Sequence, residues 1–512
     1  MPKNLFKTLL IIFSFQATIA QNITAKIVDA KTNESIPYAT ISINNSENLV
    51  SNVEGYFTIS ESNSRENATL AVSYLGYVGR QMTVQELKDQ QLIVALQPGI
   101  VELNEVNVTN VKPDPQTIMA EVKKHLNLHY KSESQATKNK VFYRETSALK
   151  PKVLNIEITK STGFSKNDLQ SVNSQVSAFT SKLIAQPPVI YRDMLCNYYT
   201  ITTKKEDKPL FLSKLEVVKA TMLKDDNNSS SLEDLKEKAS KLFLQHLDTT
   251  KYYRIKSGWF GSHDTISLRK DFYNNKDKNK NQFKKSSLLT TSKSDLNGFV
   301  SNNNFLYSNR LTFVNQPEIY DYTYEGVVYS KENEFVYMLS FKPRKSRAIY
   351  TGKLYISETD YAILRADYTL GEGEKVSGFN MKFLLGVKQS ENVSKGTLIY
   401  KQNPSGDGYY LQYGTLETGQ YIYINRPLKF IELAKDERDV LAIDLKIETD
   451  IKTKKEYLNI QKSESSEAVL QAIKEEEFKY LKLKRYDPKI WKDYGAIEPL
   501  EEMKQFEAGD QF

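Results

Sequence analysis

The stretch that decides the fold is FVYMLSFKPRKSRAIYTGKLYISETDYAILRADYTL, Phe335–Leu370. Every second residue of its first part is apolar and would lie on one side of an extended chain: Phe335, Tyr337, Leu339 and Phe341. A second run, with Leu354 and Ile356, matches the alternating run Ala362–Tyr368 across the polar turn Ser357–Asp360. Alternation with a period of two predicts a β-hairpin with one buried face. We expect this hairpin in the middle of a large antiparallel sheet.

The same pattern continues on both sides of the hairpin. Strand-like runs separated by short polar turns extend from Phe305 to about Ile451, beginning with FLYSNRLTFV and including FNMKFLLGVKQ and VLAIDLKIETDI. About ten such strands predict a large curved sheet or a partly closed barrel. The chain has 32 Tyr residues, and this composition suits a mainly β protein.

Helices are expected to pack against this sheet. Apolar residues at helical spacing predict helices at Gln116–His129, Leu232–Leu247 and Ser465–Lys482. We therefore divide the rest of the chain into 110–300 (linker, helices and first strands of the second domain), 301–455 (large antiparallel sheet or half-barrel) and 456–512. The last part would form a helix and a tail that docks on the sheet through Trp491, Tyr494, Ile497 and Leu500.

The N-terminus resembles a secretory signal peptide, residues 1–20. Lys3 and Lys7 precede the apolar run Leu9–Phe15, and Ala17–Ala20 ends in a small-x-small cleavage pattern. The apolar run is too short to cross a bilayer as a helix, and no later stretch reaches about 18 apolar residues. We therefore expect a protein secreted across the inner membrane, periplasmic or associated with the outer membrane.

Charge and cysteine content exclude several classes. The formal net charge is +7, and removal of the two leader lysines leaves +5. Positive and negative residues are interspersed, which favours solubility rather than nucleic-acid binding. Cys196 is the only cysteine, so no internal disulfide can form. Its neighbours Met194 and Leu195 predict a small buried apolar side chain rather than a catalytic thiol.

Residues 21–109 form a separate β unit in our interpretation. Short alternating strands are separated by Asn, Asp, Gly and Ser, which is typical of a sandwich. Glu54–Phe57 predicts a tight turn, with Gly55 at positive φ and Phe57 as the first core contact.

This unit resembles the carboxypeptidase-regulatory-like domain. The matching motifs are Asp29, Pro37–Ile41, Asn52–Phe57, Ser73–Tyr77 and Leu103–Val108. The resemblance implies a seven-stranded transthyretin-like sandwich, as found at the N-termini of many envelope proteins of Bacteroidetes. It implies an accessory domain and not peptidase activity. The family turn has the pattern Asp-x-(Asp or Asn)-Gly, whereas this chain has Asn52 and Glu54 at the two acidic or amide positions. This difference argues against a calcium site in the turn.

A second resemblance covers about a hundred residues around the decisive stretch. Tyr322–Leu370 resembles the lipoprotein-carrier-like half-barrels of the periplasm. Those proteins wrap a sheet around a helix and hold acyl chains on the concave face. The resemblance implies the same fold for this part of the chain, and a lipid as one candidate ligand.

The most suggestive set of metal-ligating residues lies on the first predicted helix. Glu121, His125 and His129 would share one helix face, which could serve a zinc ion. Glu is absent from the position after His125, so this is not the metalloprotease pattern, and a surface stripe is the alternative. His246 and His263 have no companion ligand nearby in sequence. We assign no metal and no cofactor.

Other catalytic patterns are incomplete. Ser262, His263 and Asp264 are consecutive and would point to opposite faces of a strand, so they cannot form a triad among themselves. Gly371–Gly373 lacks the remaining glycine of a dinucleotide loop and is interpreted as a hairpin turn. Glu372 and Glu374 suit solvated turn residues as well as glycosidase acids. We assign no catalytic residue.

The hypothesis from sequence is a non-enzymatic binding or assembly protein of the cell envelope. Its partners would be envelope proteins, a glycan or a lipid, and not nucleic acid. One alternative is a lipid or lipoprotein carrier that uses the concave face of the half-barrel. A second alternative is a hydrolase whose site is built from residues far apart in the chain.

Overall fold

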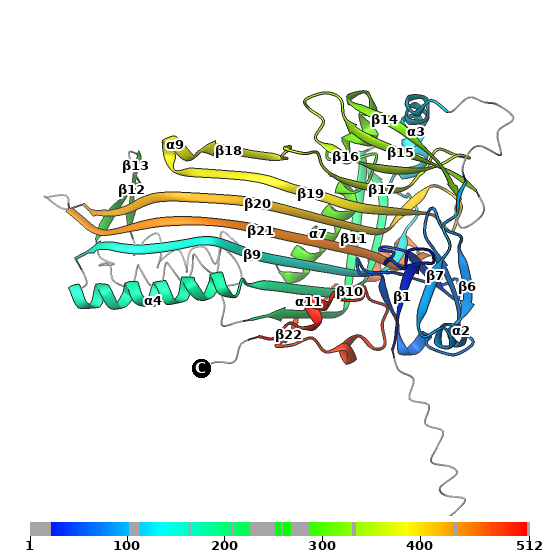
Figure 1. Cartoon of the computed structure of the whole chain (residues 1–512), viewed down its shortest axis with the longest axis horizontal. Helices are drawn as coiled ribbons and strands as arrows, with labels where there is room; N and C mark the ends of the chain where they lie inside the picture. The colour runs from blue at the N-terminus through cyan, green and yellow to red at the C-terminus, as the bar shows by residue number, and fades with distance from the viewer. Residues whose placement is uncertain are drawn as a thin grey trace, which may run out of the picture. The chain divides into compact units, whose positions relative to one another are not determined.

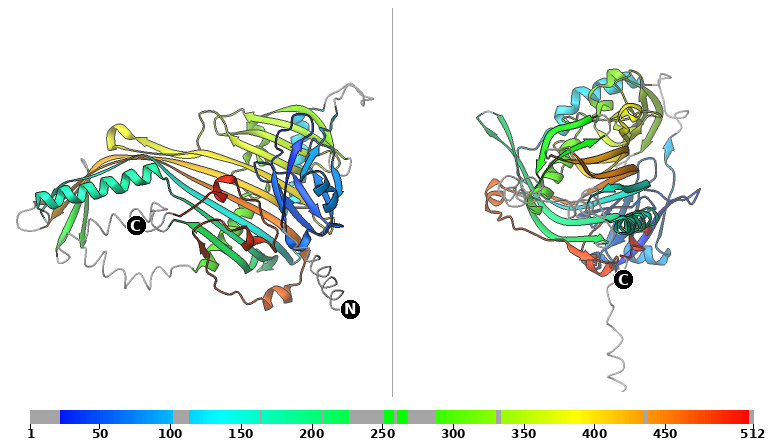
Figure 2. Two further views of the ribbon diagram at one scale, coloured as in Figure 1. Left: turned by 60° about the horizontal axis from the view of Figure 1, so that its bottom comes forward. Right: turned by 90° about the vertical axis from the view of Figure 1, so that its left-hand side faces the viewer.

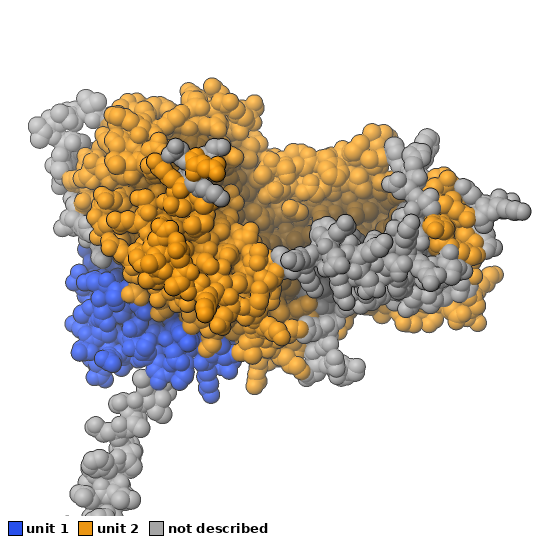
Figure 3. Space-filling model, turned by 180° about the vertical axis from the view of Figure 1, so that it is seen from behind, with its two compact units in different colours: residues 1–100, 329–332, 487–500 blue, residues 101–328, 333–486, 501–512 orange. Residues whose placement is uncertain are grey.

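The structure is a computed structural model. It describes residues 22–101, 113–162, 165–206, 208–225, 251–257, 260–267, 287–329, 334–433 and 438–508. The chain divides into two compact units, coloured separately in Figure 3. Unit 1 comprises residues 1–100, 329–332 and 487–500, and unit 2 comprises residues 101–328, 333–486 and 501–512. The predicted leader, the linker residues 109–112 and the helix Leu232–Leu247 lie outside the described residues.

Unit 1 contains the predicted sandwich. One sheet has three strands in the order β4-β1-β7, and the other has four in the order β3-β2-β5-β6. Apolar side chains of both sheets form one buried core, which includes Ile27, Ile41, Phe57, Leu70 and Val94. The seven-stranded architecture is therefore confirmed. The bounds are β1 (Ile23–Asp29), β2 (Thr40–Ile43), β3 (Glu47–Val50), β4 (Tyr56–Ile59), β5 (Thr69–Ser73), β6 (Arg80–Thr83), α2 (Val84–Asp89) and β7 (Ile93–Leu96).

The predicted turn before β4 has the expected conformation. Gly55 has a φ of +83°, and a Cβ atom there would lie 2.8 Å from the Ile27 carbonyl oxygen. Only glycine fits without strain. The Asn52 carboxamide oxygen accepts from the backbone N–H groups of Glu54 (2.9 Å) and Tyr56 (3.0 Å). Phe57 is fully buried.

The tail segment 487–500 belongs to unit 1, which corrects the expectation that the whole tail docks on the large sheet. The Asn52 amide donates to the Glu498 carbonyl oxygen at 3.3 Å, and the backbone N–H of Glu61 donates to the Lys492 carbonyl oxygen at 2.8 Å. Thr58 donates to the Glu498 carboxylate. These hydrogen bonds hold the segment 487–500 to unit 1, and the spacing of hydrophobic residues in the sequence could not reveal them.

Unit 2 is built on one large sheet. Its main path runs β22-β11-β10-β9-β21-β20-β19-β17-β16-β15-β14-β8, and β12, β13 and β18 pair beside this path. Figures 1 and 2 show that β9, β19, β20 and β21 run side by side as very long strands. The parallel pair β22–β11 makes the sheet mixed rather than wholly antiparallel.

The strand bounds show how far the sheet extends along the chain. They are β8 (Ile100–Val101), β9 (Thr137–Ser161), β10 (Val189–Lys205), β11 (Lys208–Lys224), β12 (Tyr252–Ser257), β13 (Phe260–Ser267), β14 (Tyr320–Tyr329), β15 (Phe335–Pro343), β16 (Tyr350–Ser357), β17 (Ile363–Leu370), β18 (Ser377–Met381), β19 (Val387–Gln402), β20 (Tyr409–Glu432), β21 (Arg438–Glu464) and β22 (Leu481–Leu483).

The decisive stretch forms β15, β16 and β17, as predicted. Leu354 pairs with Leu339 on one side and with Ala366 on the other. Leu339, Leu354 and Ile356 are fully buried in the core of unit 2. The β16–β17 hairpin turns at the predicted polar residues.

Helices complete the core of unit 2. α3 (Pro115–Tyr130) confirms the first predicted helix, and the Asp114 carboxylate caps its N-terminus. α4 (Lys166–Ala185) and α7 (Leu288–Asn302) were not predicted. Phe299 of α7 stacks on Tyr457 of β21, with ring centroids 5.8 Å apart. None of the helices in the described ranges is long and apolar enough to span a lipid bilayer.

Three predicted elements were wrong. FNMKFLLGVKQ is not one strand but the end of β18, the short helix α9 and the start of β19, because Gly386 at positive φ ends the helix and lets the chain turn back. FLYSNRLTFV is not a strand but turns leading into α8 (Thr312–Asn315) and then η4 (Pro317–Ile319). Here the side chains of Asn304, Ser308 and Asn315 bond to nearby backbone groups, which competes with strand pairing. The C-terminal helix is only α10 (Glu467–Ala472), because β21 continues to Glu464 and the chain turns away at Ile473. Shorter elements are η2 (Glu61–Asn63), α9 (Lys382–Leu385), η5 (Pro488–Trp491) and α11 (Glu501–Lys504).

Candidate functional site

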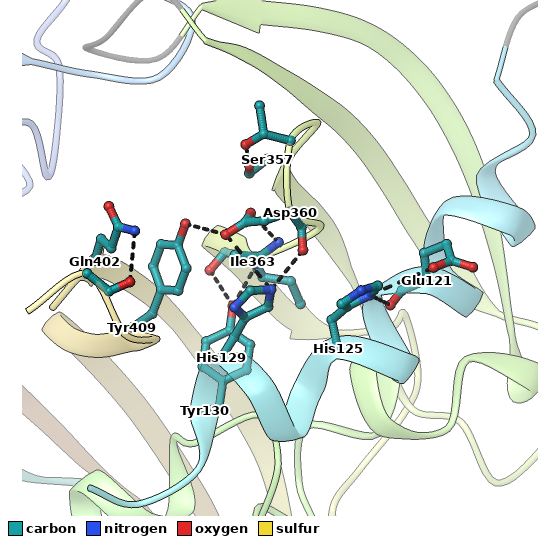
Figure 4. Close-up of polar contacts among 12 residues, drawn as sticks. Glu121, His125, His129, Tyr130, Ser357, Asp360, Ile363, Gln402 and Tyr409 are labelled. Carbon is teal, nitrogen blue, oxygen red and sulfur yellow. Dashed lines mark hydrogen bonds and ion pairs between the residues drawn. The ribbon is translucent and has the colours of Figure 1, made fainter.

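The histidine face of α3 meets the turn between β16 and β17 (Figure 4). His129 is buried, and its Nε2 lies 2.7 Å from the Asp360 carbonyl oxygen, so Nε2 carries the proton and donates. The Tyr409 hydroxyl donates to the Asp360 carboxylate at 2.8 Å. These contacts bring together α3, the hairpin turn and the start of β20.

Tyr130 is the neighbouring anchor. Its hydroxyl donates to the Ile363 carbonyl oxygen at 2.9 Å and accepts from the Ile363 N–H at 2.6 Å. Burial raises the pKa of Tyr130 well above its usual range, so the hydroxyl keeps its proton. One side chain therefore satisfies both backbone groups at the start of β17.

His125 and Glu121 do not complete a metal site with His129. The Nδ1 of His125 lies 2.8 Å from the Glu121 carbonyl oxygen, and its ring stacks on Tyr361 at 5.8 Å. The Nδ1 atom of His125 and the Nε2 atom of His129 therefore bond to different backbone carbonyl oxygens, those of Glu121 and Asp360. No group of three His, Cys, Asp or Glu side chains in the described ranges is arranged to hold a metal ion.

This cluster has the geometry of a structural junction. The Ser357 hydroxyl bonds to the Thr359 hydroxyl at 2.9 Å and lies away from His129 (Figure 4). A nucleophile–base pair, which acyl transfer would need, is therefore not formed by these two residues. Tyr361 has a φ of +60°, an uncommon conformation for a bulky residue, and its ring contact with His125 helps to hold the turn.

A second feature is a shallow groove between α4 and β9, which is open to solvent along its length. Its volume is about 930 Å³, and residues of both elements form its walls. The β9 wall consists of Glu157, Ile158 and Thr159. The α4 wall is mostly polar and uncharged, with Lys166, Leu169, Gln170, Asn173, Ser174, Ser177, Ala178 and Ser181. Such a lining offers hydroxyl and amide groups for hydrogen bonds and a few apolar contacts.

The sequence of α4 explains why this wall is polar. Ser165 and Asp168 form a capping box that starts the helix. Val176, Thr180 and Leu183 are its buried residues, whereas Ser174, Ser177 and Ser181 repeat at helical spacing on the groove face. The helix is thus amphipathic with an unusually serine-rich polar stripe.

Asn173 joins the helix to the strand. Its side chain accepts from the Ile158 N–H and donates to the Ile158 carbonyl oxygen, both at 2.9 Å. One edge of β9 pairs with β21 as far as Ser161, but the other edge pairs with β10 only as far as Ala148. In the described part of the sheet, residues 149–161 therefore have no strand partner on the edge opposite to β21. Asn173 thus imitates a neighbouring strand at one position.

A buried charge cluster lies elsewhere in the sheet of unit 2. The Arg144 guanidinium donates to both Asp193 oxygens, at 2.7 and 2.8 Å. Burial opposes the charge of Arg144, but Asp193 outweighs it and raises the Arg144 pKa above its usual range. Burial likewise opposes the charge of Glu456, yet Lys454 and Arg144 lower the Glu456 pKa. The charges compensate one another, which is typical of an interior ionic network.

The remaining sequence candidates are dispersed. Cys196 is buried, and burial raises its thiol pKa, as expected for a structural cysteine. Ser262, His263 and Asp264 lie consecutively on β13, and Gly371–Gly373 lies in the turn after β17. His246 lies outside the described residues. The groove was missed, although the capping-box spacing of Ser165 and Asp168 could have revealed α4.

Comparison with known proteins supports the assignment of the N-terminal part. Residues 23–108 match the family model of the CarboxypepD_reg-like domain. This agrees with the resemblance drawn from the sequence motifs and with the observed sandwich. No curated protein matches the chain.

Matches to solved structures are distant. A DUF1329 family protein from Desulfovibrio piger ATCC 29098 is 10% identical, covers 70% of this chain and 100% of its own, and has a TM-score of 0.17. The Pseudomonas aeruginosa MucA/MucB complex is 7% identical, with 68% and 99% coverage and a TM-score of 0.15. An outer membrane channel from Pseudomonas putida F1 is 8% identical, with 68% and 99% coverage and a TM-score of 0.10. Superpositions this poor carry no argument about function.

Proposed function

We propose that this chain is a non-enzymatic binding or assembly protein of the bacterial cell envelope. It would be exported to the periplasm or the outer membrane of a Bacteroidetes-type bacterium. The signal-like N-terminus and the CarboxypepD_reg-like match support this placement. In this proposal the sandwich of unit 1 is an adaptor, and unit 2 holds the partner.

The observation that carries the proposal is the groove between α4 and β9. Its volume of about 930 Å³ lies in the range of ligand sites in proteins. Glu157 and Lys166 are the charged residues of the lining, and serine and amide side chains supply most of its polar groups. This chemistry suits an uncharged polar partner segment, such as a polypeptide chain or a glycan.

Affinity capture from envelope extract tests this proposal with matched variants. Ser177→Trp places a large ring in the groove, and Ser171→Trp places the same ring on an exposed part of α4 that does not line the groove. We expect Ser177→Trp to lower recovery of at least one envelope partner tenfold or more, while Ser171→Trp retains it. Equal recovery with both variants would contradict the groove as the binding site.

A second candidate, a lipid or lipoprotein carrier, is favoured by one apolar cluster. Ile156 of β9, Phe430 of β20 and Leu445 of β21 are half-buried around a buried set that includes Ile158 and Ile443. Half-buried aliphatic and aromatic groups on the long strands could cover an acyl chain. Native mass spectrometry of protein purified from the periplasm tests this candidate: a co-purified lipid supports it, and consistently ligand-free protein excludes it.

A further inference from the structure

One end of β18 and the helix after it carry exposed apolar side chains. In the order of exposure these are Phe383 (99% exposed), Leu384 (74%), Phe379 (50%) and Met381 (40%). Every residue of β18 is exposed, and α9 has no buried residue. Isolated exposed apolar residues are normal, but a group of them marks an interaction surface. We call Phe379–Leu384 the apolar tip (α9 and β18 in Figure 1).

The backbone fixes the apolar tip in place. Gly386 ends α9 with a φ of +66°, and a Cβ atom there would lie 2.1 Å from the Asn425 carbonyl oxygen. The Asn425 N–H donates to the Gly386 carbonyl oxygen at 2.7 Å. β18 also pairs with β19 along its whole length. The exposed rings are therefore presented by an anchored hairpin of unit 2.

Two lysines and two tyrosines lie at the base of the tip, where Glu448 and Asp450 of β21 also face Tyr421. The Lys382 ammonium lies 4.1 Å from the ring centroid of Tyr423, and the Lys388 ammonium lies 5.4 Å from that of Tyr421. Residues 376–388 contain these two lysines and no carboxylate. Apolar side chains above a layer of tyrosine and lysine are typical of a segment that enters the interface of a membrane.

The size of the tip argues against a protein partner. Fully covered aromatic side chains bury about 150–250 Å² each. Scaled by their exposed fractions, the four side chains of the tip offer less than the roughly 800 Å² per partner that a standard protein interface buries. A lipid surface has no such minimum, because a few inserted side chains and nearby cations suffice for reversible binding.

We propose that the apolar tip docks unit 2 on a phospholipid bilayer with anionic headgroups. Phe383 and Leu384 enter the acyl boundary, and Lys382 and Lys388 contact the headgroup phosphates. This contact is separate from the groove between α4 and β9, so either can fail without the other.

Vesicle sedimentation tests the proposal. The purified chain is mixed with vesicles of phosphatidylcholine and phosphatidylglycerol, and the bound fraction is measured against lipid concentration. Phe383→Ser with Leu384→Ser should weaken binding at least tenfold. Leu128→Ser, at an exposed apolar residue of α3, should leave binding unchanged. Lys382→Gln with Lys388→Gln should weaken binding most at low salt.

Several results would overturn the proposal. One is failure of the unaltered chain to bind these vesicles. Another is equal binding by the Phe383→Ser/Leu384→Ser variant. A third is loss of self-association in that variant, measured by analytical ultracentrifugation, without any vesicle binding by the parent chain. Circular dichroism confirms that each variant is folded, as expected for substitutions at exposed positions.

Discussion

At the residue scale, Tyr130 shows how one hydroxyl can secure a strand. The Ile363 N–H and carbonyl group lie at the start of β17, and the Tyr130 hydroxyl is a hydrogen-bond partner of both. His129 beside it ties the Asp360 carbonyl oxygen to the same helix. These contacts support a structural interpretation of the histidine face, because the short hydrogen bonds of both histidines go to backbone carbonyl oxygens. The two rings stack at 6.0 Å, and the His125 Nδ1 lies 3.8 Å from the Glu121 carboxylate.

Tyr130→Phe tests that interpretation. The substitution keeps the ring but leaves the Ile363 N–H and carbonyl group without their buried partner. We expect it to lower the free energy of unfolding by about 1–3 kcal/mol. Urea denaturation measures the change. The control is Tyr307→Phe, because Tyr307 is half exposed and its hydroxyl accepts one longer bond, at 3.3 Å, from the Ser132 N–H.

The control should change the free energy of unfolding by less than about 0.5 kcal/mol. Equal losses of unfolding free energy in the two variants would mean that the hydrogen bonds of the buried Tyr130 hydroxyl do not stabilise the fold. In that case the cluster around His129 would need another explanation.

Single residues also show which sequence patterns are informative. Gly55 was predicted correctly because a tight turn before an apolar strand leaves few alternatives for its backbone. Cys196 was predicted correctly from its apolar neighbours. The contact between His129 and Asp360 could not be predicted, because these residues are 231 positions apart and no local pattern relates them.

At the element scale, the edge of β9 that pairs with no other strand is the feature that needs explanation. An unpaired strand edge invites association with other chains, and proteins commonly cover or interrupt it. Here α4 lies along β9 in Figure 1, and the Asn173 side chain forms hydrogen bonds with the N–H and carbonyl groups of Ile158. The groove is therefore bordered by a strand edge that is closed at one position by a side chain.

Asn173→Ala should loosen this edge. Removing the two hydrogen bonds to Ile158 should accelerate exchange of the Ile158 amide hydrogen about fivefold or more, since each bond contributes about 1 kcal/mol. Hydrogen–deuterium exchange of residues 150–161 measures the change. Gln175→Ala, on an exposed part of the same helix, is the control. Unchanged exchange in Asn173→Ala would show that helix packing alone protects the strand.

Elements were predicted best where one face is buried. β15, β16 and β17 were predicted correctly because Leu339, Leu354 and Ile356 pack into the core at the spacing that an extended chain requires. α4 and α7 were missed because serine, threonine and asparagine dilute their apolar spacing. The C-terminal helix was overestimated because Phe478 and Leu481 continue an apolar pattern after the chain has left the helix.

At the scale of the whole molecule, the two units differ in what the sequence reveals. Unit 1 combines a family-model match with a confirmed sandwich. Unit 2 has a sheet that was predicted from periodicity, yet its candidate sites depend on packing and exposure, which periodicity does not report. The groove forms only where α4 packs beside β9. The apolar tip consists of exposed hydrophobic residues, whereas a sequence pattern predicts that hydrophobic residues are buried.

The central claim is that unit 2 binds an envelope partner in the groove between α4 and β9. Site-specific photocrosslinking in intact cells tests it most directly, with a photoreactive residue at Ser177 or, as a control, at Ser171 of the same helix. We expect a crosslinked product of higher mass from position 177 and none from position 171. No product from position 177, or the same product from both positions, would contradict it.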